Sequence, residues 1–488
     1  MPVGFSEING TAKLLNKNKR IKLDLVGKSV SGGDISIAGD LIPQKTLAGD
    51  FRLRSQNLLA ADITRIVTLP LNLQTGRVSG DLQIKVTPNQ KTLLYGNTSI
   101  AGVTAQIPKI PQLLNNSQGN LIFDGLLITL DNIVTSYGKI PVIASGTIDQ
   151  EAGFNLKGRV NAVSLANAQS TLKVKLPVPV SGIAQADVQI LGDIAQPVLS
   201  GTVSSLKTAR IDKVDFQQVR SKFQLISSKS LLSITDIYGK TTYGGEVKGG
   251  GTINLGEVPQ LNFQLRAANI PGDAIAQVYN LKTGFPIGLM TATAEIKGVA
   301  DDTRTVVKWQ APQAKYPATG ATIINPDQTV SFRDIIADFG GGVVRGSGTY
   351  ANGRWQALAQ ANKIKLTSLV DQKQQENISL AGSEFNGRLR LSGSSSPFAI
   401  ETIIPENANV NIAGGNVNIS QIQLRNQNFT ALLVGKGLRL SKILKQANPV
   451  LNNPLAGNFM IAGNLDNFNL QTLTGLGEAN LAVGGGNN

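Results

Sequence analysis

Few residues of this chain could carry out chemistry, because two of the most reactive types are missing. The 488 residues include neither His nor Cys. Without imidazole or thiolate groups there is no Cys or Ser-His nucleophile, no disulfide, and no zinc or redox-metal site built from the usual ligands. We therefore expect a protein that is not an enzyme and that uses no cofactor.

The remaining candidates for chemistry are an acid pair and two glycine runs. Asp301 and Asp302 could form a general acid/base couple or a Ca²⁺ site, but neighbours in a strand point to opposite faces, and in a loop they are merely solvated. We interpret this pair as part of a turn. The runs Gly249–Gly251 and Gly340–Gly342 lack the Gly-Lys-Ser/Thr ending of a phosphate loop and open no helix, so we interpret them as bulges or turns.

The charge balance is basic, with 46 Lys and Arg against 32 Asp and Glu, a net charge of +14 and a pI near 9.7. Such an excess suits an anionic partner such as nucleic acid or a lipid-headgroup surface. Nucleic-acid binding also needs aromatic side chains among the cations, and the 15 Phe, 7 Tyr and 2 Trp rarely lie near them. We expect no nucleic-acid partner and a solvated basic face, densest at residues 17–22.

Alternation with a period of two dominates the chain and predicts half-exposed β-strands joined by short turns, as in an antiparallel meander. In residues 154–162, for example, Leu156 and Val160 alternate with Lys157 and Arg159. The inward apolar positions are candidates for lining a groove: Leu82, Ile84, Val86, Phe154, Leu156, Val160, Val188, Ile190, Leu261, Phe263, Leu265, Leu389, Leu391, Val417 and Ile419.

The chain also contains a longer sequence repeat of roughly 100 residues, each copy of which includes several strands. It contains a Gly-Thr phrase with a preceding aromatic-glycine turn, a short helical stretch about twenty residues later, and an apolar-Gly return to strand. Structural glycines mark the copies: Gly39, Gly146, Gly251, Gly348, Gly80, Gly182, Gly288, Gly382 and Gly457. The predicted modules are residues 1–110, 111–220, 221–315, 316–410 and a shortened 411–488. Helices are predicted near residues 62–67, 164–168, 273–279, 367–372 and 441–446, with Ser, Thr or Asp as caps.

The continuous apolar face of such strands must be covered, because leaving it in water costs about 25 cal/mol per Å². The sheet must close on itself as sandwiches or a solenoid, or fold over into a trough that a partner fills. Periodicity does not choose between a sealed core and an open groove.

The residues also resemble a known family. The segment Val180–Gly201 resembles the recurring "SG, alternating strand, GxLxxPxxxG" phrase of TamB and the AsmA-like superfamily, and the Asp-Ile, Gly-Gly and Gly-Thr blocks do so as well. The resemblance implies an elongated, folded-over (taco-like), repetitive antiparallel β-sheet with an aliphatic groove and a few short interrupting helices. Family members are implicated in phospholipid transport between membranes, in assembly of outer-membrane barrels and, in the chloroplast inner-envelope relative, in protein import.

We therefore expect an all-β, non-catalytic bridge in the cell envelope, on the periplasmic side, whose groove shields lipid acyl chains for phospholipid transport and outer-membrane biogenesis. The expected partners are phospholipid acyl chains, the inner- and outer-membrane surfaces and an outer-membrane barrel protein. No targeting segment or membrane-spanning helix is evident, so the chain resembles a middle portion of relatives that carry an inner-membrane anchor. The alternatives are a chaperone that augments the strands of outer-membrane proteins, and a structural β-solenoid or adhesin with a sealed core.

Overall fold

A computed structural model describes residues 4–17, 19–43, 48–66, 71–107, 112–174, 176, 178–280, 285–299, 302–370, 379–395, 398–444, 449–465, 469 and 472–481. It divides into two compact units. The first unit contains Met1–Thr242 and Lys248–Leu261, and the second contains Tyr243–Val247 and Asn262–Asn488.

The strands of the first unit are numbered in chain order. They are β1 Phe5–Leu15, β2 Arg20–Ser29, β3 Asp34–Ile42, β4 Ala48–Leu59, β5 Asn72–Val86, β6 Leu93–Gln106, β7 Leu114–Gly125, β8 Leu127–Tyr137, β9 Ile140–Asp149, β10 Gly153–Ser164, β11 Val180–Ser181, β12 Ile183–Gly192, β13 Val198–Ser205, β14 Ala209–Ile211, β15 Val214–Ile226 and β16 Leu231–Thr241. Two further strands contain residues of both units: β17 Glu246–Asn254 and β18 Gln260–Pro271.

The second unit continues with twelve strands among its described residues. They are β19 Leu289–Val299, β20 Asp302–Ala311, β21 Ala318–Ile324, β22 Val330–Phe339, β23 Gly342–Ala351, β24 Arg354–Lys365, β25 Glu384–Ser395, β26 Phe398–Ile412, β27 Gly415–Arg425, β28 Asn428–Leu438, β29 Leu455–Asn464 and β30 Thr474–Leu481.

Helical elements are few and short. The α-helices are α1 Ala60–Ile66, α2 Leu165–Leu172 and α3 Gly272–Val278, and the 3₁₀ turns are η1 Ser227–Lys229, η2 Leu366–Ser368, η4 Leu440–Lys442 and η5 Pro449–Asn452. The five predicted helical positions are thus occupied, but the last two hold only 3₁₀ turns. Residues 67, 371–372 and 445–446 of these predictions lie outside the described residues.

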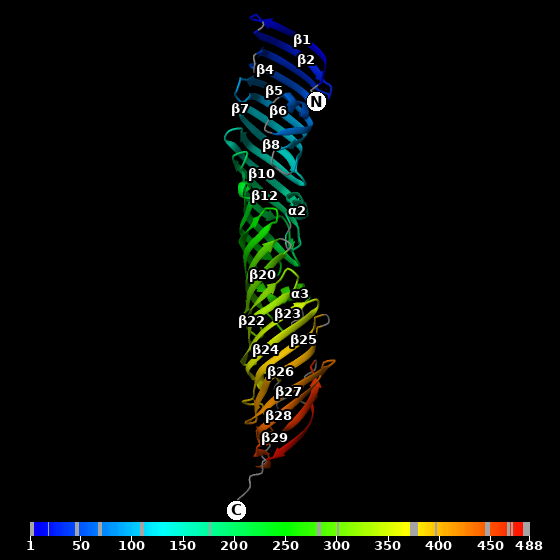
Figure 1. Cartoon of the computed structure of the whole chain (residues 1–488), viewed down its shortest axis with the longest axis vertical. Helices are drawn as coiled ribbons and strands as arrows, with labels where there is room; N and C mark the ends of the chain where they lie inside the picture. Colours follow the sequence, from blue (N-terminus) through cyan, green and yellow to red (C-terminus); the bar gives the residue numbers. More distant parts are fainter. Residues whose placement is uncertain are drawn as a thin grey trace, which may run out of the picture. The chain divides into compact units, whose positions relative to one another are not determined.

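Strand pairing is antiparallel and follows the chain. In the first unit β1 to β10 pair in order, β10 then pairs with β12, β12 with β13, and β13 with β15. In the second unit β19 to β30 pair in order. Within each unit, Figure 1 shows this order as a regular succession of colours. The predicted all-β, repetitive antiparallel sheet with short interrupting helices is confirmed.

Repeated bulges bend the strands of both units. In the phrases Leu130–Ile133, Ile234–Ile237 and Phe332–Ile335, the third residue has a positive φ: Asn132 at 47°, Asp236 at 52° and Asp334 at 51°. Each lies where the strand register shifts by one residue. Asn and Asp tolerate this left-handed conformation better than other side chains, and a bulge bends the strand that contains it. The repeated Asp/Asn-Ile phrase therefore encodes a bend.

The helical segments fold back onto the glycine turns of the repeat. In α2, the Ser164 hydroxyl caps the helix by accepting a hydrogen bond from the N–H of Asn167 at 3.2 Å, as predicted. At the other end of α2, the buried Thr171 hydroxyl accepts from the N–H of Lys139 at 3.1 Å. A side chain on the neighbouring Gly138, which has a φ of 56°, would lie 2.7 Å from Thr171, so glycine permits the approach.

The glycine runs differ in part from the prediction. Gly340 and Gly341 form the turn between β22 and β23, and Gly342 begins β23. Gly249–Gly251 instead lie inside β17, so this run is not a turn, and its interpretation as a bulge stays a prediction. A side chain on Gly250 would lie only 2.9 Å from the carbonyl oxygen of Ile234, which explains a small residue in this strand. The boundaries of the five predicted modules stay a prediction.

Candidate functional site

The apolar face of the first unit is a packed core. Of the predicted inward residues, Leu82, Ile84, Phe154, Leu156 and Val160 are each 4–8 % exposed. They belong to strands that also contribute the outward charged residues of the same alternation, and those remain exposed. The alternation therefore predicted the inward side of these strands correctly. At these residues the inward side is a core that is closed to water.

This core includes a helix as well as the sheet. Ala60 and Ile63 of α1 are 0 % and 5 % exposed and pack in the same cluster as Leu53, Leu58 and Leu82. Because one short helix covers only part of a face this long, the sheet itself must curve over the rest. Among the other predicted residues here, Leu261 is buried, whereas Val86, Val188 and Ile190 are half-buried.

The apolar face of the second unit is more open. All of its predicted residues are half-buried: Phe263, Leu265, Leu389, Leu391, Val417 and Ile419. Their register partners are small or aliphatic, since Leu389 lies opposite Ala359 and Val417 opposite Val410. These half-buried residues keep part of their apolar surface accessible.

Strands β24 to β29 present this inward surface without a charged side chain. Starting from Leu389 and following the register pairs, the inward positions hold Trp355, Ala357, Ala359, Leu391, Ile403, Pro405, Ala408, Val410, Val417, Ile419, Leu433 and Phe459. The alternation of residues 355–361 carried this signal, although Trp355, Ala357 and Ala359 were not among the predicted residues. This face of β24 to β29 could therefore contact an apolar ligand without placing an unpaired charge against it.

Charged side chains occupy the outward face, where they pair across strands. Arg159 and Asp187 lie 3.1 Å apart with both side chains 70 % exposed, and Arg390 and Glu406 lie 2.8 Å apart. Exposed pairs of this kind stabilise a protein by less than about 1 kcal/mol. Their role here is mainly to hold the outward face polar, which fixes the side of the sheet that faces solvent.

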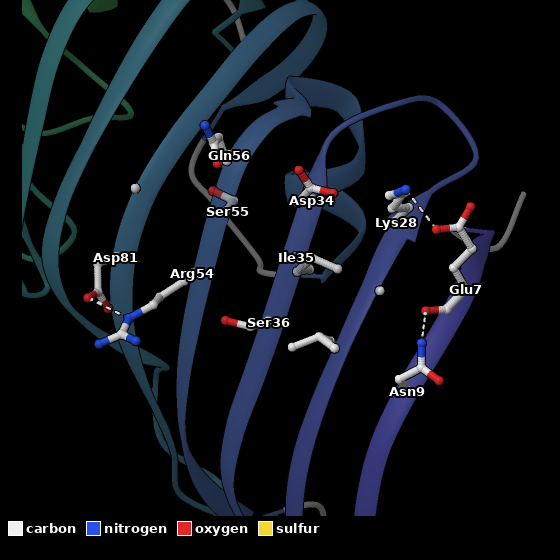
Figure 2. Close-up of a pocket in the computed structure, with 13 residues that line it drawn as sticks. Glu7, Asn9, Lys28, Asp34, Ile35, Ser36, Arg54, Ser55, Gln56 and Asp81 are labelled. Carbon is white, nitrogen blue, oxygen red and sulfur yellow. Dashed lines mark hydrogen bonds and ion pairs between the residues drawn. The ribbon is translucent and has the colours of Figure 1, made fainter.

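An open hollow of about 740 Å³ lies on the outward face of β1 to β5 in the first unit (Figure 2). Apart from Asp34, its charged side chains have partners: the Lys28 ammonium lies 2.7 Å from the Glu7 carboxylate, and Arg54 lies 3.0 Å from Asp81. Arg52 also pairs with Asp81, and hydrogen bonding from Arg52 and Arg54 lowers the pKa of Asp81 to about 2. This hollow therefore presents mainly satisfied ion pairs.

The residues considered for chemistry do not assemble into a reactive site. Asp302 begins β20 and is exposed, whereas Asp301 lies outside the described residues. Across the part of the chain that the structure describes, no three His, Cys, Asp or Glu side chains gather to hold a metal ion. The most distinctive feature of both units is instead the apolar face.

The repeat glycines have structural positions on the sheet. Gly39, Gly146, Gly251 and Gly348 lie in strands β3, β9, β17 and β23, and Gly80 and Gly457 lie in β5 and β29. Gly182, Gly288 and Gly382 lie where the chain returns from a helical segment to the sheet. There, Gly182 accepts a hydrogen bond from the N–H of Leu165 at 3.0 Å, and Gly288 accepts one from the N–H of Gly272 at 2.7 Å. These hydrogen bonds join the start of each helical segment to the residue at which the chain re-enters the sheet.

Comparison with known proteins identifies a distant relative. The chain is 24 % identical over 388 residues to the chloroplastic protein TIC236 of Arabidopsis thaliana. The match covers 69 % of this chain but 18 % of that relative, so the chain corresponds to less than a fifth of its length. No protein-family model matches the chain. Among the described helices, none is long and apolar enough to span a bilayer.

Proposed function

We propose that this chain is a segment of a non-catalytic cell-envelope bridge, similar to the TamB and AsmA-like proteins, whose apolar sheet face shields phospholipid acyl chains between two membranes. The charge-free inward face of β24 to β29, where all the predicted residues are half-buried although Ala408 is fully buried, is the observation that carries the proposal. The distant similarity to TIC236 supports an envelope protein of this kind. The segment would lie in the aqueous space between the membranes, and its ligands would be acyl chains.

The chemistry of the face suits a ligand that must move. An acyl chain of about 16 methylenes gains roughly 13 kcal/mol on leaving water, at ~0.8 kcal/mol per CH₂, and would gain a similar amount in a membrane. Moving an acyl chain from the membrane to the sheet face therefore changes its free energy little. Small aliphatic side chains offer no deep pocket in which the chain would become trapped, and a charged inward residue would oppose passage.

Site-specific photocrosslinking in the native envelope tests this function. A photoreactive residue is placed at Leu389, which is inward and half-buried, and at the neighbouring Arg390, which is outward and exposed. Lipid attached at Leu389 but not at Arg390 is the expected result. A third position, Leu156, is 8 % exposed and should crosslink mainly within its own chain.

Two other outcomes point to the alternative functions. If Leu389 captures no lipid and crosslinks only within the chain, the second unit also has a sealed core, and a structural role replaces the bridge. If the crosslinks instead form to unfolded outer-membrane proteins, strand augmentation is the function.

A further inference from the structure

The ladder between β26 and β27 is incomplete. Register pairs join these strands only from Ala408–Ile419 to Ile412–Gly415. Strand β26 nevertheless extends back to Phe398, and β27 extends on to Arg425. Those extensions pair only with their outer neighbours, β26 with β25 and β27 with β28. We call the unpaired stretch, residues 398–407 beside residues 420–425, the seam.

The sequence explains why pairing stops here. Pro405 has no N–H to donate, and proline within a strand is confined to edges and bulges. Asn407 has a φ of 51° at a register shift in β26, and a second shift in β27 occurs at Ser420. Because bulges twist and bend the strand that contains them, the ladder hydrogen bonds stop just beyond Ala408, although the two strands remain neighbours there.

A side chain holds the open end of the seam. Gln427 lies in the turn that follows β27. The Gln427 side-chain amide donates a hydrogen bond to the Ile400 carbonyl oxygen of β26 at 3.2 Å. A side chain thus supplies a hydrogen bond across the seam. One such bond contributes about 1 kcal/mol, so little energy holds the strands together here.

The opposite end of the seam is firmly fixed. Ala408, where pairing begins, is 0 % exposed. The turn beyond it is tied to η4, because the N–H of Arg439 donates to the Ala413 carbonyl oxygen at 3.1 Å. Opening would therefore pivot about the Ala408 end and widen toward the margin that carries Gln427.

The seam is lined by apolar side chains that lead to the inward face. Ile422 and Leu424 of β27 are half-buried, and Ile403 of β26 lies opposite Leu391 of that face. Ile404 is 51 % exposed on the outward side. At the open end the Phe398 ring is 65 % exposed and stacks on Trp355 with ring centroids 5.7 Å apart. Apolar surface thus continues from solvent to the inward face.

Cations flank the outer side of this apolar path. Arg390, the register partner of Ile404, already pairs with Glu406 at 2.8 Å, whereas Arg425 ends β27 as an exposed residue. A phospholipid has this combination of parts, an apolar chain attached to an anionic phosphate. We infer that the seam is a lateral opening through which one acyl chain of a phospholipid enters the second unit, with its phosphate held outside by Arg425. This inference rests on the proposed function and locates its access site.

A reversible clamp across the seam tests this inference. The chain contains no Cys, so Ile404→Cys with Gln423→Cys introduces two thiols, four residues beyond the last register pair on each strand. Thr349→Cys with Gln356→Cys, a register pair in the complete ladder of β23 and β24, is the matched control. Each clamp is closed by oxidation or by a short bismaleimide, and loss of free thiols verifies closure. The probe is pyrene-labelled phospholipid in vesicles of phosphatidylcholine and phosphatidylglycerol, mixed with the full chain.

Closing the seam clamp should slow lipid uptake by about tenfold or more, and reductant should restore the rate of the oxidised protein. The control clamp should leave uptake unchanged. Unchanged uptake with a closed seam overturns the inference while the proposed function stands. If the open, unclamped chain takes up no labelled lipid at all, the proposed function fails and this inference falls with it. If the clamp blocks binding of an extended peptide but not of lipid, the seam is a strand-augmentation site instead.

Two single substitutions give an independent measurement. Gln427→Ala removes the side chain that holds the open end and should raise the uptake rate, whereas Gln421→Ala on β27 should not. Pro405→Val supplies the missing N–H and should lower the rate. Equal rates in all three variants and the parent chain would contradict a lateral opening.

Discussion

The carboxylate of Asp273, in the first turn of α3, accepts a hydrogen bond at 2.9 Å from the backbone N–H of Gly288, where the chain returns to the sheet. It also accepts one from the N–H of Ile287 at 2.8 Å, and these two backbone donors lower the pKa of Asp273. The helical excursion is therefore closed by a charge-assisted contact as well as by the backbone bond from Gly272.

Replacing Asp273 by Ala should loosen this return of the chain. The amides of Ile287 and Gly288 should then exchange with deuterium faster, because their acceptor is gone. Asp302→Ala, an exposed position at the start of β20, serves as the control. In the parent chain the protection should persist below the usual range of an Asp carboxyl, because a lowered pKa keeps Asp273 ionised there. Unaltered exchange in the Asp273 variant would show that the backbone bond alone closes the loop.

Charge substitution should separate the two apolar faces. Leu156→Asp introduces a charge into the packed core of the first unit and should lower the free energy of unfolding by more than about 4 kcal/mol. Leu389→Asp lies on the half-buried face of the second unit and should cost roughly 1–2 kcal/mol while abolishing lipid uptake. Urea unfolding and the vesicle assay measure the two effects. Equal destabilisation at both positions would contradict an open face in the second unit.

Two glycines with positive φ should respond differently to substitution by alanine. Gly146 has a φ of 122°, and an added Cβ would lie 2.2 Å from the carbonyl oxygen of Asn155 on the next strand. Gly382 has a φ of 69° with open space around an added Cβ. Gly382→Ala should cost about 1 kcal/mol of conformational strain, and Gly146→Ala about 3 kcal/mol or more. Urea midpoints of the two variants give the comparison, and similar values would show that the strands separate to accommodate the side chain.

Stability of the first unit should decline in acid partly through Asp81. The unfolded carboxyl has a pKa near 3.8, and Arg52 and Arg54 lower it to about 2 in the folded protein. A lowered folded pKa stabilises the protein above the unfolded value, and this contribution disappears as the pH falls from about 4 toward 2. Asp81→Asn should therefore flatten the decline of the urea midpoint over this range. The effect should be small, because the Asp81 side chain is 42 % exposed and solvent screens the pair. Parallel pH curves for the two proteins would assign the acid sensitivity to other carboxyls.

Much of the fold was predictable because strand alternation is a local property of the sequence. The inward and outward sides of β10 follow directly from the order of residues 154–162, and the Ser164 cap was recognisable from its type and place. The burial of Leu156 and the partial exposure of Leu389 were not predictable. Both alternate with charged neighbours, and the difference between them arises from what lies over each residue in three dimensions.

The seam shows the same limit in another form. Proline within a strand is typical of an edge, so Pro405 indicates an interrupted ladder. Whether β26 and β27 form a complete ladder depends also on the bulges at Asn407 and Ser420. The sequence likewise did not distinguish the two interpretations of the run Gly249–Gly251, a turn or a bulge. Glycines usually mark turns, whereas here Gly250 lies beside the carbonyl oxygen of Ile234 within a strand.

Pairing in chain order also determines how such a chain can acquire its structure. Because β20 to β30 each join the strand that precedes them, the contacts that form a new strand need only the residues just before it. Folding can then advance strand by strand from the first hairpin, with a low loop-closure cost at each step. A polypeptide emerging from a ribosome or a translocation pore could assemble this ladder as it appears, without waiting for its distant end.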